Sequence, residues 1–104
     1  MTSYRRLTRL LKAKYPQYLV SVRRVRQKDL GNTGTYEKDP TNPKRCFWIT
    51  IKNTLDEQAA IDTLLHEFAH VLSYDHWELT GDEHNPVWAY YHSVLYGIYQ
   101  RELT

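Results

Sequence analysis

The chain has 104 residues, of which 41% are hydrophobic and 25% charged, and its formal net charge is +2 at neutral pH. This length supports one hydrophobic core, so we expect a single domain over residues 1–104. The composition is typical of a soluble globular protein, and no stretch is apolar enough to cross a bilayer, so no membrane contact is expected. The lone Cys46 excludes an internal disulfide and a zinc site built from cysteines. Because no apolar secretory leader opens the sequence, we expect a cytoplasmic protein.

The charge is unevenly distributed along the chain. Residues 1–28 contain nine Lys or Arg and no acid, whereas residues 29–104 contain five basic and twelve acidic residues, which gives +9 and −7. A basic segment of this kind is typical of proteins that contact DNA or another polyanion. One alternative is a solvated basic helix face followed by strand-edge side chains. Another is a mitochondrial presequence, although here the basic run continues into a predicted strand.

The first half of the sequence predicts a helix, a strand and an irregular connection. Residues 3–15 place Tyr and Leu on one helical face and Arg and Lys on the other, with Ser3 as the N-cap and Pro16 ending the helix. Residues 18–26 are rich in β-branched side chains and alternate imperfectly, which favours a strand with an exposed basic face. Residues 29–45 contain two glycines and two prolines and offer little core, so we expect a loop or an irregular hairpin.

The second half predicts a strand and two helices. Residues 46–52 alternate between two faces and form the clearest strand of the sequence. Thr54 and Glu57 fit a capping box that starts a helix directly after this strand. Residues 73–84 are polar and predict a loop, and the Asn-Pro pair at 85–86 predicts the start of a last helix. We therefore expect an α+β fold in which a small, twisted, mainly antiparallel sheet packs with about three helices.

The first of these two helices carries His-Glu-Phe-Ala-His at positions 66–70. In a helix His66 and His70 lie one turn apart on one face, with Glu67 beside them. This pattern gives a divalent metal two imidazole nitrogens and places a carboxylate next to a metal-bound water. Two surface histidines beside a glutamate on an ordinary helix would show the same spacing. An apolar stripe on roughly the opposite face can anchor the helix in the core, and it consists of Ile61, Leu64, Leu65, Phe68 and Leu72.

A catalytic zinc site normally has three protein ligands and a water, so a third ligand is required. His76 would nearly complete the metzincin pattern, but Ser73 stands where that pattern has its turn-forming glycine, and the only methionine is Met1. His84 is the better candidate, because it stands just before a helix start, where a loop can deliver it toward the polar face that carries His66. Carboxylates are a further alternative, namely Glu78, Asp82 and Glu83.

From His66 to Leu95 the sequence resembles the SprT/Spartan-like zinc metallopeptidases and the wider gluzincin-type minimal proteases. In these, His-Glu-x-x-His is followed, after a loop of about this length, by a His-Gly-x-x-Trp or similar element. This chain has His-Asn-Pro-Val-Trp at positions 84–88, with Asn85 in place of the usual glycine. The resemblance implies a zincin-like fold with one Zn²⁺ ion, and a strand at 46–52 that forms a sheet edge able to pair with a peptide. It also implies that His66, His70 and His84 are the ligands, that Glu67 is catalytic and that Trp88 packs against the site.

The expected function is that of a minimal zinc-dependent metallopeptidase acting on a protein or peptide substrate. Glu67 would take a proton from a metal-activated water and pass it to the leaving amine. An oxyanion donor is also expected, and the tyrosines nearest to the ligands in sequence are Tyr74, Tyr90 and Tyr91. Two alternatives remain: a module that binds nucleic acid or another polyanion around a structural zinc site, and a catalytically silent regulator of the same fold. By resemblance, the small size and the few catalytic residues also fit a phage or bacterial accessory protein.

Overall fold

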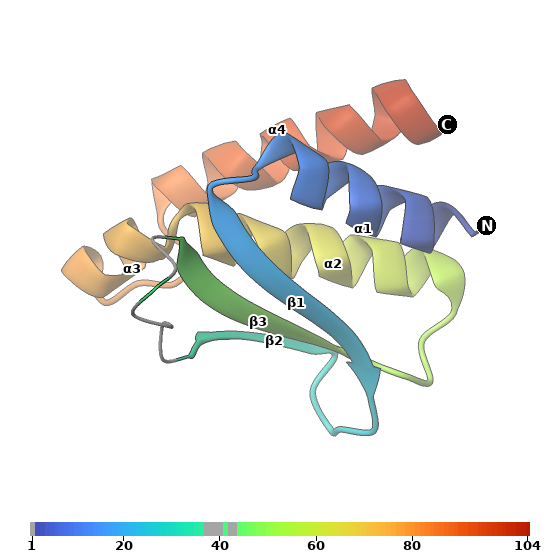
Figure 1. Cartoon of the computed structure of the whole chain (residues 1–104), viewed down its shortest axis with the longest axis horizontal. Helices are drawn as coiled ribbons and strands as arrows, with labels where there is room; N and C mark the ends of the chain where they lie inside the picture. The colour runs from blue at the N-terminus through green and yellow to red at the C-terminus, as the bar shows by residue number, and fades with distance from the viewer. Residues whose placement is uncertain (1, 37–40, 42–43) are drawn as a thin grey trace.

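The structure is a computed structural model that describes residues 2–36, 41 and 44–104, including the backbone but not the side chain of Glu78. Within these residues the chain forms four helices and three strands (Figure 1). The α+β class predicted from the sequence is confirmed. No described helix is both long enough and apolar enough to cross a membrane. In chain order the elements are α1 (Ser3–Lys14), β1 (Tyr18–Val25), β2 (Gly31–Thr35), β3 (Arg45–Lys52), α2 (Glu57–Leu72), α3 (Tyr74–Thr80) and α4 (Pro86–Leu103).

The sheet is mixed and has the strand order β1-β3-β2. β1 runs parallel to β3, so that Val22 lies opposite Ile49. β2 runs antiparallel to β3, with Thr33 opposite Ile49 on the other side. One of the two pairings is therefore parallel, where the sequence predicted a mainly antiparallel sheet. β3 is the central strand, so the expectation that residues 46–52 form a sheet edge is wrong, and the edges belong to β1 and β2.

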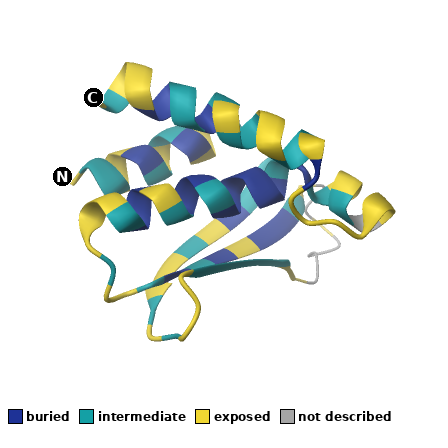
Figure 2. Ribbon diagram, turned by 180° about the vertical axis from the view of Figure 1, so that it is seen from behind, coloured by how far each residue is buried: buried dark blue, intermediate teal, exposed yellow. Residues whose placement is uncertain are grey.

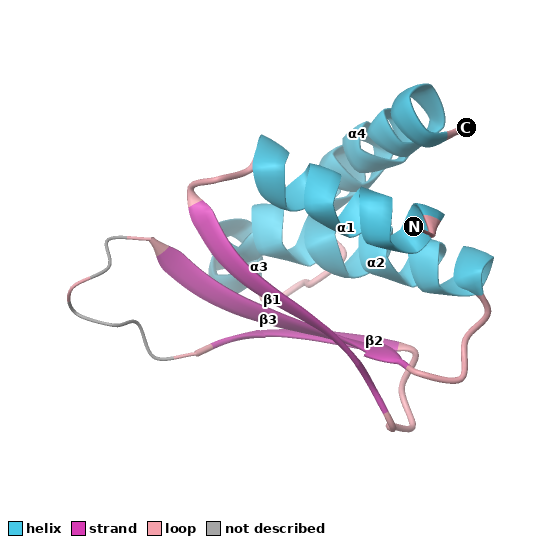
Figure 3. Cartoon of the chain, turned by 45° about the vertical axis from the view of Figure 1, so that its right-hand side comes forward, coloured by secondary structure: helices cyan, strands magenta, loops and turns pink. Residues whose placement is uncertain are grey.

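A shared hydrophobic core joins the sheet to the helices. β3 contributes Phe47, Ile49 and Ile51, which are fully buried, and an apolar strand of this kind gains most from the central position. α1 and α2 pack on this face of the sheet, and α4 packs on α1 and α2 (Figure 3). Helix α2 is thus enclosed between the sheet and α4, and its residues 67–71 are all buried (Figure 2).

The start of α1 differs slightly from the predicted one. The helix begins at Ser3 itself, and Thr2 is the N-cap, because the Thr2 hydroxyl accepts a hydrogen bond from the Arg5 amide at 3.2 Å. The helix ends at Lys14, before Pro16, as the sequence predicted. Its leucines are directed into the core, where Leu7 and Leu11 are fully buried.

The predicted capping box of α2 is also wrong in detail. Asp56 is the N-cap instead of Thr54, and its carboxylate accepts a hydrogen bond from the Ala59 amide at 2.8 Å. A carboxylate at this position also faces the positive end of the helix dipole. Glu57 does not take part in a capping box, and its Oε1 atom accepts a hydrogen bond from the Tyr4 amide at 3.1 Å instead. This bond joins the first turn of α1 to the first turn of α2.

Strand β2 lies inside the segment 29–45, which the sequence predicted as a loop or irregular hairpin. Its sequence, Gly-Asn-Thr-Gly-Thr, contains no large apolar side chain, so hydrophobic alternation could not reveal it. Its glycines allow close contacts instead, since a Cβ atom on Gly34 would overlap the indole ring of Trp48. The rest of the prediction falls partly on residues 37–40 and 42–43, which lie outside the described residues.

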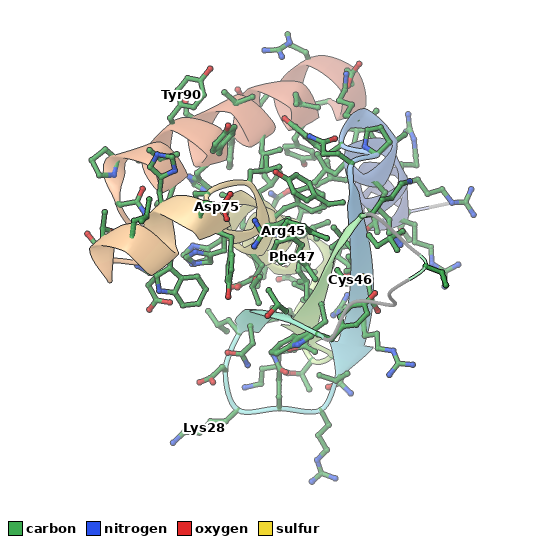
Figure 4. All side chains as sticks on the ribbon, turned by 60° about the vertical axis from the view of Figure 1, so that its left-hand side comes forward. Lys28, Arg45, Cys46, Phe47, Asp75 and Tyr90 are labelled. Atoms are coloured by element: carbon green, nitrogen blue, oxygen red, sulfur yellow. The ribbon has the colours of Figure 1, made fainter. Side chains whose placement is uncertain are left out.

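Helix α3 lies inside the segment 73–84, which the sequence predicted as a loop. The guanidinium of Arg45 attaches this helix to β3, because it pairs with the Asp75 carboxylate and lies over two aromatic rings (Figure 4). The helix ends at Thr80, and its C-cap is Gly81, whose φ of 71° lies in the left-handed region that favours glycine. Because this seven-residue helix is held by contacts with the distant Arg45, its own sequence shows no hydrophobic periodicity from which it could be predicted.

Candidate metal centre

Helix α2 places two histidines of the His-Glu-x-x-His motif side by side. The Nε2 atoms of His66 and His70 lie 3.2 Å apart on successive turns. His70 is buried, with 5% of its surface exposed, whereas His66 is only partly buried. The helix is held in this position by its apolar stripe, all of which joins the core: Ile61, Leu64, Leu65 and Phe68 are buried, and Leu72 is partly buried.

The turn between α3 and α4 brings a third imidazole to this pair. The Asp82 carboxylate accepts a hydrogen bond from the His84 amide at 3.0 Å. Asn85 accepts hydrogen bonds from the amides of residues 87 and 88, and its side-chain amide donates to the Asp82 carbonyl at 2.9 Å. The N-cap predicted at Asn85 is thus confirmed. With the turn held in this way, Nε2 of His84 lies 3.2 Å from Nε2 of His66.

Two of the distances between the imidazoles match those expected around a tetrahedral zinc ion. Zn–N bonds of about 2.0–2.1 Å at tetrahedral angles separate two ligand nitrogens by about 3.3 Å. The Nε2 atom of His66 is 3.2 Å from both of its partners, and the ligand atoms of all three residues lie within 4.8 Å of one another. Three imidazoles with a fourth position left for water are also the donor set of a catalytic zinc site. His66, His70 and His84 can therefore hold a metal ion.

Trp88, on the first turn of α4, packs against all three imidazoles. Its ring centroid lies 4.9 Å from that of His66, 5.6 Å from that of His70 and 4.8 Å from that of His84. Its indole nitrogen donates a hydrogen bond to the His66 carbonyl at 3.2 Å. The ring is also stacked on His92 at 4.9 Å and an interplanar angle of 9°. Trp88 thus fixes α4 to the motif helix beside the imidazoles.

Burial and crowding keep His66 and His70 neutral. Burial, together with the like charges that the nearby His66 and His84 would carry, lowers the pKa of His70 from 6.5 to about 4. Burial likewise lowers the pKa of His66, with additional contributions from His84 and His92. Metal ions bind the neutral form of imidazole. At neutral pH the rings of His66 and His70 therefore bind a metal ion with little competition from protons.

One buried nitrogen of the group, Nδ1 of His70, has no hydrogen-bond partner among the described residues. The backbone of Glu83 raises the pKa of His70, but this effect is smaller than those that lower the pKa. A metal-binding histidine usually donates its second ring N–H to an acceptor. A proton on Nδ1 leaves Nε2 free as the ligand.

Glu67 is buried beside the imidazoles, with 6% of its surface exposed. The Thr33 hydroxyl donates a hydrogen bond to Oε1 at 2.7 Å, and Oε2 lies 3.9 Å from Nε2 of His66. Because the lowered pKa keeps His66 neutral at pH 7, the latter contact is not an ion pair. Burial raises the pKa of Glu67, and the charge of Glu83 adds to this effect, whereas the Thr33 hydrogen bond and His84 lower it. The net increase in pKa makes this carboxylate a stronger base.

Strand β2 passes directly over α2 at Gly31. A Cβ atom on Gly31 would lie 2.6 Å from Cγ2 of Thr63 and 2.9 Å from Cγ of Glu67, so a side chain here would displace the strand or the glutamate. This close contact places the strand at the rim of a cavity of about 200 Å³ around the imidazoles. The cavity is lined by Gly31, Asn32, Thr33, His66, Glu67, His70, Trp77, Glu83 and His84.

Among the described side chains, the other ligand candidates are not part of the group of three imidazoles. His76 is exposed on α3, and the group of three imidazoles contains His84 instead. Asp82 forms part of the turn that carries His84, and Glu83 lines the cavity. The side chain of Glu78 lies outside the described residues.

None of the three tyrosines considered as oxyanion donors lines the cavity. Tyr74 packs edge-on against Phe47, and Tyr90 is 64% exposed on the outer side of α4 (Figure 4). Tyr91 packs against Tyr90. Sequence reasoning missed four residues of the cavity, namely Gly31, Asn32, Thr33 and Trp77. The only signal for the first three was a pair of glycines without a turn motif, and Trp77 gave none.

Comparison with protein-family models, with curated proteins and with solved structures finds no match for the chain. The resemblance to the SprT/Spartan-like peptidases therefore rests on the motif residues alone. To these the structure adds an α+β fold in which three imidazoles and a buried glutamate lie together.

The lowered pKa of His70 predicts how the stability of the metal-free protein depends on pH. As the pH falls below 6.5, the unfolded chain binds a proton at this position, whereas the folded protein resists it until about pH 4. The free energy of unfolding should therefore be highest above pH 6.5 and should fall by about 1–3 kcal/mol between pH 6.5 and 4. Urea unfolding in the presence of a chelator measures this.

The same experiment on His70→Gln should show a smaller fall, because the buried titrating group is gone. His76→Gln is the matched control, since His76 is exposed, and it should behave like the unmodified protein. A fall in His70→Gln as large as that in the unmodified protein would contradict the prediction.

Proposed function

We propose that the chain is a zinc-dependent metallopeptidase in which His66, His70 and His84 hold the ion and Glu67 is the general base. The observation that supports this most strongly is the pair of 3.2 Å distances that join the three imidazole nitrogens beside a buried glutamate. A site with only a structural role gains nothing from such a carboxylate, because burying an acid costs free energy. When bound, the zinc ion would activate a water molecule and polarise the scissile carbonyl.

Glu67 has the environment that a general base requires. Thr33 occupies Oε1 by its hydrogen bond, so the carboxylate is held in one orientation. Oε2 is the oxygen on the side of His66, and it can accept a proton from a water in the cavity. The increased pKa from burial favours this transfer, and the same group can then deliver the proton to the leaving amine.

The substrate would bind along β2, which replaces β3 as the sheet edge next to the site. The Leu30 carbonyl accepts a hydrogen bond from the Lys52 amide at 2.9 Å, and the Tyr36 amide donates to the Cys46 carbonyl at 3.4 Å. Backbone groups alternate in direction along an antiparallel pair. Residues 30 and 36 bond to β3, so the backbone N–H and C=O groups of the odd-numbered residues between 30 and 36, including Gly31 and Thr33, point away from β3. An extended peptide can pair with them there, next to the imidazoles.

Two substitutions separate metal binding from catalysis. Glu67→Gln should retain one zinc ion per chain but lose peptide hydrolysis by about 10²–10⁴-fold, because the base is removed while the imidazoles remain. His84→Ala should lose both zinc and activity, because two imidazoles bind the ion weakly. Metal analysis of the purified proteins and cleavage of a mixed peptide library measure the two effects.

His76→Ala serves as the control for His84→Ala and should keep both zinc and activity. If the zinc-loaded protein cleaves no peptide although it binds one ion, the catalytically silent regulator of the same fold is the better description. If His84→Ala retains zinc and His76→Ala loses it, the assignment of the third ligand is wrong.

Thr33 is expected to act as a positioning residue for Glu67. Thr33→Val removes the hydroxyl and keeps the shape, so kcat/KM should fall about tenfold while the zinc content is unchanged. Because the Thr33 hydrogen bond lowers the pKa of Glu67, its loss should also move the acidic limb of the pH–rate profile to higher pH. Thr33→Ser keeps the hydroxyl and should restore both. An unchanged pH profile in Thr33→Val would contradict this role.

A second candidate function, contact with a nucleic acid, is supported by one hollow between α1 and β1. It has a volume of about 290 Å³, and none of its described lining residues is acidic. Arg24 has a structural task there, because its guanidinium donates to the carbonyls of Asn53 and Leu55. Arg5 and Arg9 lie one helical turn apart and can pair with phosphate oxygens. The full lining consists of Tyr4, Arg5, Thr8, Arg9, Val22 and Arg24.

If this hollow binds phosphate groups, Arg5→Gln combined with Arg9→Gln should weaken binding of a single-stranded oligonucleotide about tenfold and reduce its salt dependence by about two charges. Arg23→Gln combined with Arg26→Gln removes the same charge outside the hollow and should have a clearly smaller effect. Fluorescence anisotropy over a series of salt concentrations measures both. Equal losses in the two double variants would indicate diffuse attraction without a defined site.

A further inference from the structure

A second hollow adjoins the metal centre on the other side of Gly31. It has a volume of about 300 Å³ and is lined by Leu30, Gly31, Asp62, Thr63, His66 and Glu67. It shares Gly31, His66 and Glu67 with the cavity around the imidazoles. A substrate whose scissile bond lies at the imidazoles therefore passes the mouth of this hollow.

Most of the wall of this hollow is apolar and fixed. The side chain of Leu30 is 60% exposed, but its backbone is held to β3 by the bond from the Lys52 amide. The Thr63 hydroxyl donates to the Ala59 carbonyl of its own helix at 2.8 Å, and its Cγ2 methyl group faces Gly31. Leu30, Gly31 and the Thr63 methyl group thus form a surface suited to the methylene groups of a substrate side chain.

Asp62 adds a negative charge to this apolar surface. It lies four residues before His66, which is about 6 Å along the helix axis. Its Oδ1 atom accepts a hydrogen bond from the Gln58 side chain at 3.1 Å, and no ion pair among the described residues includes it. A carboxylate beside apolar walls and without a cation of its own is what a long basic side chain would complement.

We propose that this hollow receives an arginine or lysine side chain next to the scissile bond, and that Asp62 determines this specificity. The inference rests on the proposed peptidase function and adds the class of substrate. One helical turn separates Asp62 from His66, and a basic side chain spans this distance while its stem lies against Leu30 and the Thr63 methyl group. An acidic side chain would be repelled by Asp62 and Glu67, and a purely apolar one would give Asp62 no cationic partner.

The test compares peptides that differ at one position beside the scissile bond. The zinc-loaded full chain should cleave those with Arg or Lys faster than those with norleucine, and those with Glu slowest. Asp62→Asn should lower kcat/KM for the basic peptides about fivefold and leave the norleucine peptide nearly unchanged, as expected for a partly solvated ion pair. Asp62→Lys should shift the preference toward Glu.

Asp29→Asn is the matched control, because it removes the same charge from a residue that adjoins Leu30 but does not line the hollow. It should keep the preference for basic peptides. A preference for norleucine in the unmodified protein, or an unchanged preference in Asp62→Asn, would overturn the proposal.

A binding experiment keeps this inference separate from the peptidase function. Nα-acetyl-arginine amide should shift the NMR signals of the Gly31 and Thr63 amides more than Nα-acetyl-norleucine amide does, and Asp62→Asn should remove the difference. If no peptide is cleaved but this selective binding is observed, the peptidase proposal fails and the basic-side-chain site stands. If peptides are cleaved without preference and neither amide binds selectively, the site fails and the peptidase stands.

Discussion

The structure depends on one constraint, which is that helix α2 must be buried on nearly all sides and still carry three polar motif residues. The sheet covers one side of the helix, and α1 and α4 cover others. His70 and Glu67 are therefore both shielded from solvent. His70 is kept in its neutral form, and the Glu67 carboxylate is held by the hydrogen bond from Thr33 instead of by water. The low pKa of His70 and the raised pKa of Glu67 have this common origin in burial. The chemistry proposed for the site thus follows from how the core is packed.

Much of this arrangement could be predicted from the sequence, because its signals are local. The period of the apolar stripe identified α2, and the alternation around Phe47 identified β3. The Asn-Pro pair at 85–86 identified the start of α4 and so placed His84 at the end of a turn. The preference for His84 over His76 followed from that helix start, and it agrees with the group of imidazoles that the structure brings together.

The features that could not be predicted depend on contacts between distant segments. β2 has no apolar pattern, and it forms because Gly31 and Gly34 allow close approach to α2 and to Trp48. Its pairing decides that β3 is central and that Thr33 reaches Glu67, which lies 34 residues away in sequence. Helix α3 likewise depends on Arg45, 30 residues away. Local propensity carries no information about such partners.

The turn that carries His84 affects the stability of the segment between α2 and α4. An ion shared by α2 and the first turn of α4 would cross-link positions that are 18 residues apart and close the intervening segment, including α3, into a ring. Closing a ring removes conformational freedom from the unfolded chain, and the gain is largest where few other contacts restrain the segment. The exposed helix α3 is such a segment. A metal ion bound at the three imidazoles would therefore stabilise α3, the helix that contributes least to the hydrophobic core.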